Sequence, residues 1–309
     1  MDVLYWFESI RSPFLTGLMS AVTWLGHEIL PIVVVCIFYW CVSKKTAYKM
    51  AFSFFFSGLC VQGLKITFRI DRPWILDPDF KPVESAIGAA TGYSFPSGHT
   101  QAATSLYGTL AMLLKKWWAK LICVIIMLLV ATSRLYLGVH TPLDVGVALA
   151  VTLVTTVIVC LVYDRLYGKK NAALIVSVIM AAMSGAILIY GIVLLNKGVI
   201  DYANVRDAFK TSGAGMAFAV GYAIERIYIN FEVKAKNVGM QIVKVLCGVA
   251  PALGAYLGLK VLFNAIFTTT ESMILGDFLR YFILVIWIIA VYPAIFKAVS
   301  AKKSQIAFT

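Results

Sequence analysis

The feature that most constrains this chain is a succession of about nine long apolar stretches, close to the ~20 residues that an α-helix needs to cross a bilayer. Of its 309 residues, 61% are hydrophobic and only 14% are charged. This composition leaves too little polar surface to cover a water-soluble globule. The sequence therefore predicts an all-α integral membrane protein. The expected spans are residues 22–42, 46–64, 99–115, 118–133, 143–163, 173–195, 212–225, 240–263 and 278–296.

The basic residues predict the orientation of these spans. If the spans alternate, 16 of the 27 Lys and Arg residues fall in the loops of one side, which the positive-inside rule makes cytoplasmic. The N-terminus is then outside and the C-terminus inside. The net charge of +12 accordingly indicates cytoplasmic loops and not a nucleic-acid partner, and the short loops favour a bacterial plasma membrane. The sixteen are Lys44, Lys45, Lys49, Lys115, Lys116, Lys120, Arg165, Lys169, Lys170, Arg226, Lys234, Lys236, Lys244, Lys297, Lys302 and Lys303.

The first large outer loop begins with two cations, Lys65 and Arg72, which are seven residues apart. Seven residues make about two helical turns, so both side chains can point the same way. Pro73 disfavours helix at the residue before it and is expected to end the helix there. Cations at the end of a span also form ordinary interfacial charge belts, so these residues alone leave both interpretations open.

The same loop ends with Pro96-Ser97-Gly98-His99, directly before the third apolar stretch. Ser97 is a favoured N-cap residue, and Gly98 lets the backbone approach a ligand closely. The free N–H groups and the positive dipole end of a helix N-terminus make a ready anion site. A plain helix start accounts for Pro96 and Ser97 but not for His99.

A second outer segment carries Arg134, His140 and Asp144. Thr141 is predicted as an N-cap with Pro142 as the first helical residue, which places Asp144 in the first turn, where a carboxylate favours the helix dipole. Asp144 also follows His140 by four residues. It can therefore accept a hydrogen bond from one ring nitrogen and leave the other free to attack. Helix capping and catalysis both stay open for Asp144.

The three segments together place three cations, two histidines, one carboxylate and a helix N-terminus on one side of the membrane. Each such charge costs ~2.5–3.5 kcal/mol at the bilayer centre, so a cluster without a purpose is unexpected. The combination describes a phosphate pocket with a nucleophile and an acid. We expect no metal or other cofactor, because the acidic residues and the histidine spacing suit neither magnesium, calcium nor zinc, and the six cysteines lie in apolar stretches.

These residues resemble the motifs of the membrane phosphatase superfamily named after type 2 phosphatidic acid phosphatase, which is related to the vanadium haloperoxidases. Its pattern is Lys-x6-Arg-Pro, then Pro-Ser-Gly-His, then Ser-Arg-x5-His-x3-Asp, and all three parts are present in order. The resemblance covers roughly residues 20–165. It implies a bundle of about six helices with a metal-free site at the membrane surface. Haloperoxidase chemistry is disfavoured because the related peroxidases are soluble.

The resemblance also implies the role of each site residue. His140 is the expected nucleophile, which forms a phosphohistidine, and Asp144 orients it. His99 is expected to protonate the leaving oxygen and then to act as base for the hydrolytic water. The expected ligands of the phosphoryl oxygens are Lys65, Arg72, Ser97, the Gly98 N–H and Arg134.

We therefore expect a phosphatase-like core in residues 1–170 and, in residues 171–309, about three accessory transmembrane helices of unknown role. The expected substrate is a lipid phosphate or a lipid pyrophosphate, because a soluble substrate would not require a membrane scaffold. The family includes enzymes for undecaprenyl diphosphate, phosphatidylglycerol phosphate, phosphatidate and sphingoid phosphates. Two alternatives stay open: transfer of the phosphoryl group to another acceptor, and a transporter or flippase that binds phosphorylated lipids.

Overall fold

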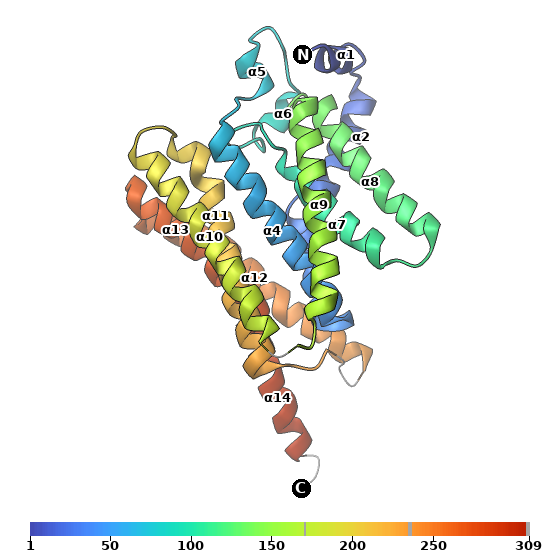
Figure 1. Ribbon diagram of the computed structural model, residues 1–309, viewed down its shortest axis with the longest axis vertical. Coiled ribbons are helices and arrows are strands. Elements are labelled where there is room, and N and C mark those ends of the chain that lie inside the picture. The colour runs from blue at the N-terminus through green and yellow to red at the C-terminus, as the bar shows by residue number, and fades with distance from the viewer. Residues whose placement is uncertain (170, 234–236, 307–309) are drawn as a thin grey trace. The chain divides into compact units, whose positions relative to one another are not determined.

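The computed structural model describes residues 1–169, 171–233 and 237–306, with side chains as far as residue 299. Throughout these residues the regular structure is helical, which confirms the predicted all-α class (Figure 1). Of the cytoplasmic cations predicted above, Lys170, Lys234 and Lys236 lie outside the described residues, as do the side chains of Lys302 and Lys303. The longer helices are α2 (Pro13–Thr23), α3 (Ile29–Ile37), α4 (Lys44–Phe68), α7 (Gly98–Leu113), α8 (Trp117–Tyr136), α9 (Pro142–Leu166), α10 (Ala172–Asn196), α11 (Tyr202–Ile224), α12 (Val238–Ile266), α13 (Thr270–Ile286) and α14 (Tyr292–Ile306).

Six segments of the described chain are long and apolar enough to cross a membrane, and a bent pair of helices adds a possible seventh. The six are Lys44–Leu76, Trp117–Tyr136, Pro142–Leu166, Ala172–Asn196, Val238–Ile266 and Thr270–Val299. Two of the expected spans, residues 99–115 and 212–225, correspond to α7 and to the second half of α11, and neither helix is among the six.

The expected span at residues 22–42 is not one continuous helix, which corrects the sequence-based prediction. It is divided between α2 and α3, which meet at an angle of 48° across a short 3-10 turn at Trp24–Gly26. Gly26 lies against the backbone of α7, where a Cβ atom would come within 2.7 Å of the His99 carbonyl oxygen. The break therefore lies where the chain makes a close tertiary approach.

The described chain forms two compact units. The first consists of residues 1–34, 49–165 and 191–208, and the second of residues 35–48, 166–190 and 209–309. The first unit contains all the residues that the sequence predicts for the site. The division predicted near residue 170 stays a prediction.

In the first unit, α7 is a buried helix that packs against α8. Small side chains such as Ala102, Ala103 and Ser105 allow the helix backbones to approach closely, as they do in other membrane bundles. The buried face of α8 includes Cys123 and Val130, seven residues apart, whereas its other residues include many exposed apolar ones that suit contact with lipid. This packing fixes the start of α7 and the end of α8 at the same end of the unit.

The same end of the unit holds the loop that connects α4 to α7, with its short helices α5 (Pro73–Leu76) and α6 (Glu84–Ile87) (Figure 1). The N-terminal helix α1 (Asp2–Ser9) is joined to this loop by a hydrogen bond of 3.0 Å from the Tyr5 hydroxyl to Asp77. Arg11 donates to the carbonyl of Tyr136 at the end of α8 and to that of Lys81. The N-terminal segment thus fastens the loop to the bundle.

The second unit contains a buried ionic contact and three π-helical turns, at Phe38–Val42, Glu225–Ile229 and Trp287–Val291. Glu225 is fully buried and accepts hydrogen bonds from Lys44, at 2.8 Å, and from the Tyr48 hydroxyl. Between α11 and α13 the backbones approach closely, because a Cβ atom at Gly213 would lie 2.2 Å from the carbonyl oxygen of Phe278.

We expect Gly213→Ala to destabilise the second unit, because the added methyl group overlaps the Phe278 backbone. Overpacking of this kind typically costs about 1–3 kcal/mol. Gly254→Ala in α12 is the matched control, since a Cβ atom there meets nothing within 4 Å and alanine favours helix. Thermal unfolding in detergent measures both changes. Equal melting temperatures for the two variants would contradict the close approach.

Candidate active site

Two cations enter the site from the end of α4 and from the segment that follows it. Lys65 lies in the last turn of α4 and Arg72 directly precedes α5, and both side chains are buried. They do not share a continuous helix, which corrects the sequence argument: α4 ends at Phe68 and Arg69 has a left-handed backbone with φ of 53°. The expected juxtaposition is nevertheless present, because both cations reach the same loop, residues 91–93.

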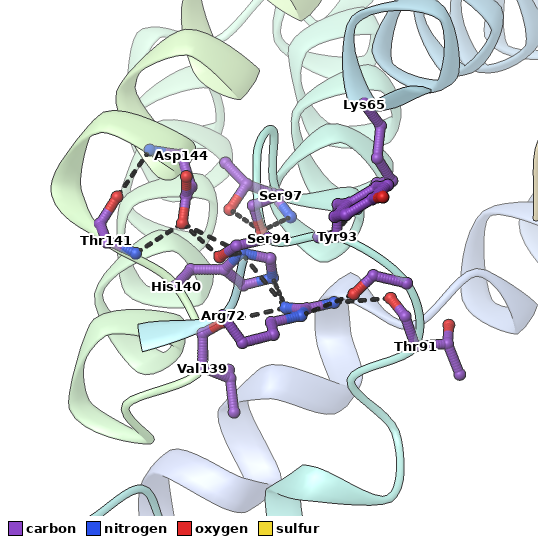
Figure 2. Close-up of polar contacts among 12 residues, drawn as sticks. Lys65, Arg72, Thr91, Tyr93, Ser94, Ser97, Val139, His140, Thr141 and Asp144 are labelled. Atoms are coloured by element: carbon purple, nitrogen blue, oxygen red, sulfur yellow. Dashed lines mark hydrogen bonds and ion pairs between the residues drawn. The ribbon is translucent and has the colours of Figure 1, made fainter. Parts of the chain in front are cut away.

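Three consecutive carbonyl oxygens of this loop hold the two cations (Figure 2). Lys65 Nζ donates to the carbonyl of Tyr93 at 2.6 Å. The Arg72 guanidinium donates to the carbonyl of Gly92 at 3.1 Å and to that of Thr91 at 2.7 Å. Carbonyl dipoles orient the two cations without cancelling their charge, so the charge stays available for an anion.

The third cation, Arg134, lies in the last turn of α8 and is only 2% exposed. Its Nη1 donates to the Thr23 hydroxyl at 2.7 Å, whereas its Nε has no hydrogen-bond partner among the described residues. A buried charged donor without a partner is costly, so an unpaired guanidinium nitrogen indicates a missing acceptor. An anionic ligand supplies such an acceptor.

His140 lies in the short link between α8 and α9, next to Asp144 in the first turn of α9 (Figure 2). The carboxylate Oδ2 of Asp144 is 3.6 Å from His140 Nδ1 and accepts hydrogen bonds from the Ser94 hydroxyl, at 2.6 Å, and from the Thr141 backbone, at 2.7 Å. Thr141 Oγ1 in turn accepts from the Asp144 N–H at 3.3 Å. Asp144 therefore caps α9 and faces the imidazole, so the structure unites the two roles that the sequence left open.

The contacts of His140 favour one position for the proton of the neutral ring. Arg72 Nη1 lies 3.1 Å from Nε2 and 3.5 Å from Nδ1, so the guanidinium group is close to both ring nitrogens. The Asp144 carboxylate, which can only accept, lies 3.6 Å from Nδ1, and the Ser94 hydroxyl lies 3.4 Å from it. These neighbours favour the proton on Nδ1, which leaves the lone pair on Nε2.

Burial and the nearby cations act on His140 in the same direction. Burial, followed by the positive charges of Arg72, Arg134 and Lys65, holds the pKa of His140 well below its usual value of 6.5. The imidazole is consequently neutral at pH 7, which is the form that can act as a nucleophile.

The start of α7 forms another side of the site. Ser97 caps the helix by accepting from the Thr100 backbone at 3.4 Å and from the Thr100 hydroxyl at 3.0 Å. The Ser97 N–H donates to the carbonyl of Asp144 at 3.1 Å, which joins the starts of α7 and α9. Next to this cap, a Cβ atom at Gly98 would meet open space, so the backbone there is accessible.

His99 follows in the first turn of α7 and is partly exposed. Its ring lies edge-on to that of His27, with the centroids 5.8 Å apart, and His27 in turn stacks on Trp24 at 4.7 Å. The positive charge of Arg134 also acts on His99. The segment that breaks between α2 and α3 therefore forms part of the surroundings of His99.

The structure brings all eight predicted residues to the same end of the first unit, and it adds six that the sequence did not indicate. Ser94, the carbonyls of residues 91–93, Thr23 and Gly26 all contact predicted residues. Ser94 and Thr23 are ordinary hydroxyl residues with no distinctive spacing, so no sequence pattern indicates them. Among the described residues, no three His, Cys, Asp or Glu side chains are grouped so that they could hold a metal ion.

This chain is similar to three proteins of known name or structure. Phosphatidylglycerophosphatase B of Bacillus subtilis (strain 168) is 29% identical over 149 residues, which make up 44% of this chain and 69% of that protein. Among solved structures, Aquifex aeolicus LpxE shares 24% identity with a TM-score of 0.45, and covers 52% of this chain and 93% of its own. The first transmembrane PAP2 type phosphatidylglycerolphosphate phosphatase from Bacillus subtilis shares 26% identity with a TM-score of 0.46. The match covers 55% of this chain and 86% of that protein's chain.

Two family models match separate parts of the chain. The PAP2 superfamily model matches residues 46–168, which include every predicted site residue. A second model, described as the transmembrane extension of PAP2 superfamily phosphatases, matches residues 209–304, for which the sequence analysis found no motif. The two matches together include most of the chain, and the first contains the complete three-part motif: this protein belongs to the PAP2 superfamily.

Proposed function

We propose that this protein is a metal-independent membrane phosphatase, which hydrolyses the phosphate monoester or pyrophosphate of a lipid through a phosphohistidine on His140. The observation that carries the proposal is the placement of His140 Nε2 at 3.1 Å from the Arg72 guanidinium, with Nδ1 toward Asp144. A phosphoryl group bound by Arg72 would lie next to the imidazole of His140, whose Nε2 carries the lone pair. Phosphoryl transfer requires mainly such positioning, together with stabilisation of the oxyanion charge.

The first step forms a bond between Nε2 and phosphorus and breaks the bond from phosphorus to the leaving oxygen. His99 donates a proton to this oxygen, and the lipid alcohol or the shorter phosphate departs. In the second step His99 takes a proton from water, whose oxygen attacks the phosphohistidine and releases inorganic phosphate with free Nε2. Asp144 stabilises the positive charge of the imidazole ring throughout. The phosphoryl oxygens are bound by Lys65, Arg72, Arg134, the Ser97 hydroxyl and the Gly98 N–H.

The first step requires a neutral His140 and a protonated His99. Binding of the substrate can favour this combination. Without a ligand, burial, followed by positive charges that include those of Arg134, Arg72 and Lys65, disfavours a proton on His99 and lowers its pKa. A bound phosphate dianion offsets these cations and thereby favours the protonated imidazole that the first step needs. The substrate would thus prepare the acid that acts on it.

The lipid nature of the substrate is supported by the membrane-spanning helices and by the similarity to phosphatidylglycerophosphatase B. A lipid phosphate presents its headgroup at the membrane surface, where the ends of the helices meet. Phosphatidylglycerol phosphate is therefore the first substrate to test, within a panel that includes phosphatidate, a sphingoid phosphate and undecaprenyl diphosphate.

The central test measures phosphate release by the purified protein from this panel in EDTA. We expect turnover to persist in the chelator and His140→Ala to lower kcat by at least about 10³-fold, as loss of a nucleophile does elsewhere. Arg72→Ala should lower kcat/KM about 10²-fold or more. Arg69→Ala is its matched control, because Arg69 donates to the Ile66 carbonyl of its own segment.

Normal turnover by the His140 variant would refute the nucleophile assignment, and loss of activity in EDTA that zinc or magnesium restores would refute metal independence. Replacing water with an alcohol or a sugar as acceptor distinguishes hydrolysis from phosphotransfer. Lipid uptake into vesicles that survives in the His140 variant would instead favour a transporter.

The lowered pKa of His140 predicts the pH dependence of the enzyme. An imidazole with a lowered pKa stays neutral until the pH falls to that lowered pKa. His140 therefore remains able to act as a nucleophile in weakly acidic solution. We expect the acidic limb of kcat/KM, which reports the free enzyme, to lie below pH 6.5. The substrate phosphate has its own second ionisation near pH ~6. Its pKa is measured separately, and its contribution is removed from the pH profile of kcat/KM. An enzymatic limb above 6.5 would contradict this environment of His140.

We also propose that the site faces the extracytoplasmic side. Helix α7 runs from the site to Leu113 and α8 returns from Trp117 to Arg134, so Lys115, Lys116 and Lys120 lie at the far end of this pair. Lys44 and Arg165 likewise lie at the ends of α4 and α9 that are remote from the site. By the positive-inside rule that far end is cytoplasmic.

Labelling with a membrane-impermeant maleimide tests this orientation. In intact cells we expect Asp79→Cys, an exposed position in the loop at the site end, to react, and Lys116→Cys to react only after the membrane is permeabilised. Reaction of the unsubstituted chain, which has an exposed Cys247, gives the background. The opposite pattern of labelling would place the site on the cytoplasmic side.

A further inference from the structure

The two cations before the nucleophile are oriented by a loop and not by acidic partners. The carbonyls of Thr91 and Gly92 accept hydrogen bonds from Arg72, and the carbonyl of Tyr93 accepts one from Lys65, at distances of 2.6–3.1 Å (Figure 2). Any shift of this loop therefore moves both cations together. The loop itself is not helical and is partly exposed, so its position needs an external support.

The first turns of α11 provide that support. The Thr91 hydroxyl donates to the carboxylate Oδ2 of Asp207 at 2.7 Å. Gly92 has a φ of 61°, and a Cβ atom there would lie 3.4 Å from the carbonyl oxygen of Asn204. Asn204 and Asp207 are three residues apart and so lie on the same face of the helix. The neighbouring Val205 is fully buried, which anchors this part of α11 in the first unit.

This support comes from a part of the chain outside the family's two matched regions. The family models match residues 46–168 and 209–304, so Asn204 and Asp207 lie between them. The contact joins residues that are 116 positions apart in the sequence. The contact therefore involves the segment that connects the two matched regions.

We propose that Asp207 is a positioning residue of the active site, which fixes Lys65 and Arg72 through the Thr91 hydroxyl and the carbonyls of residues 91–93. The inference rests on the proposed phosphatase function. Asp207 does not touch the phosphoryl group itself. Its effect is mechanical and passes through one hydrogen bond, so an uncharged acceptor of the same shape serves equally well.

An electrostatic role is the competing explanation, and the two differ in a measurable way. The carboxylate of Asp207 also attracts Lys65 and Arg72 at longer range. If this attraction were the main effect, Asp207→Asn would be as harmful as Asp207→Ala. If the hydrogen bond is the main effect, Asp207→Asn keeps an acceptor for Thr91 and retains activity.

The experiment compares kcat and KM for phosphate release from phosphatidylglycerol phosphate, together with inhibition by orthovanadate. We expect Asp207→Ala and Thr91→Val each to lower kcat/KM by about 10–100-fold and to weaken vanadate inhibition in parallel, as loss of an outer-shell partner does. Asp207→Asn and Thr91→Ser should each recover kcat/KM to within about threefold of the unsubstituted protein, because both keep the hydrogen bond. The double variant Thr91→Val with Asp207→Ala should be no worse than the more affected single variant.

Asp201→Asn is the matched control. It removes the same charge from an exposed position six residues earlier, and asparagine is as good a helix cap as aspartate. We expect it to leave kcat, KM and vanadate inhibition unchanged. The melting temperature of every variant shows whether a loss of activity reflects unfolding of the protein. Unfolding would lower kcat, and Asp207→Asn would then not restore it.

Several outcomes overturn the proposal. These are a loss in Asp207→Asn equal to that in Asp207→Ala, additive losses in the double variant, or kcat/KM of Asp207→Ala within twofold of the unsubstituted protein. Failure of the proposed function is distinct from all of these: the unsubstituted protein would then release no phosphate from any lipid of the panel.

Discussion

The rest of the site depends on the burial of three cations in a place where they retain their charge. Lys65, Arg72 and Arg134 are each no more than 5% exposed, and the buried carboxylate among them is that of Asp144. Burying a charge is costly unless it is paired or hydrogen-bonded. Here much of the compensation comes from backbone carbonyls, which stabilise a cation without neutralising it. The site is therefore strongly positive, and a phosphate dianion is the natural complement.

The same hydrogen bonds also satisfy backbone carbonyl oxygens of the connection between α4 and α7. The long connection from α4 to α7 contains little helix, so many of its carbonyl oxygens lack partners within the segment. Within the described chain, Lys65 at the end of α4 and Arg72 before α5 donate their hydrogen bonds with this loop to carbonyl oxygens and not to carboxylates. When the loop folds over these two cations, the carbonyls of residues 91–93 accept their hydrogen bonds, so the cations and the loop satisfy each other. The irregular loop is thus part of the surroundings of these cations.

The sequence predicted the helices best where a single stretch forms a single helix. The expected spans 118–133, 143–163 and 173–195 agree with α8, α9 and α10 to within a few residues. Prediction failed where a tertiary contact decides, as in the break between α2 and α3, which depends on Gly26 meeting the backbone of α7. The motif residues were found because their types and spacing carry the chemistry. Ser94 and Asp207 were not found, because their partners are 50 and 116 residues away.

Asp144 shows why a short motif can specify so much of a site. The same carboxylate oxygen closes the first turn of α9 and faces the imidazole, so the helix cannot start correctly without placing the charge beside His140. The carbonyl of Asp144 also accepts from the Ser97 N–H, which sets the start of α7 against the start of α9. One residue thereby links two helix starts to the orientation of the His140 imidazole. The spacing of four residues from His140 to Asp144 follows from that geometry: it places the carboxylate in the first helical turn while the histidine stays in the link before it.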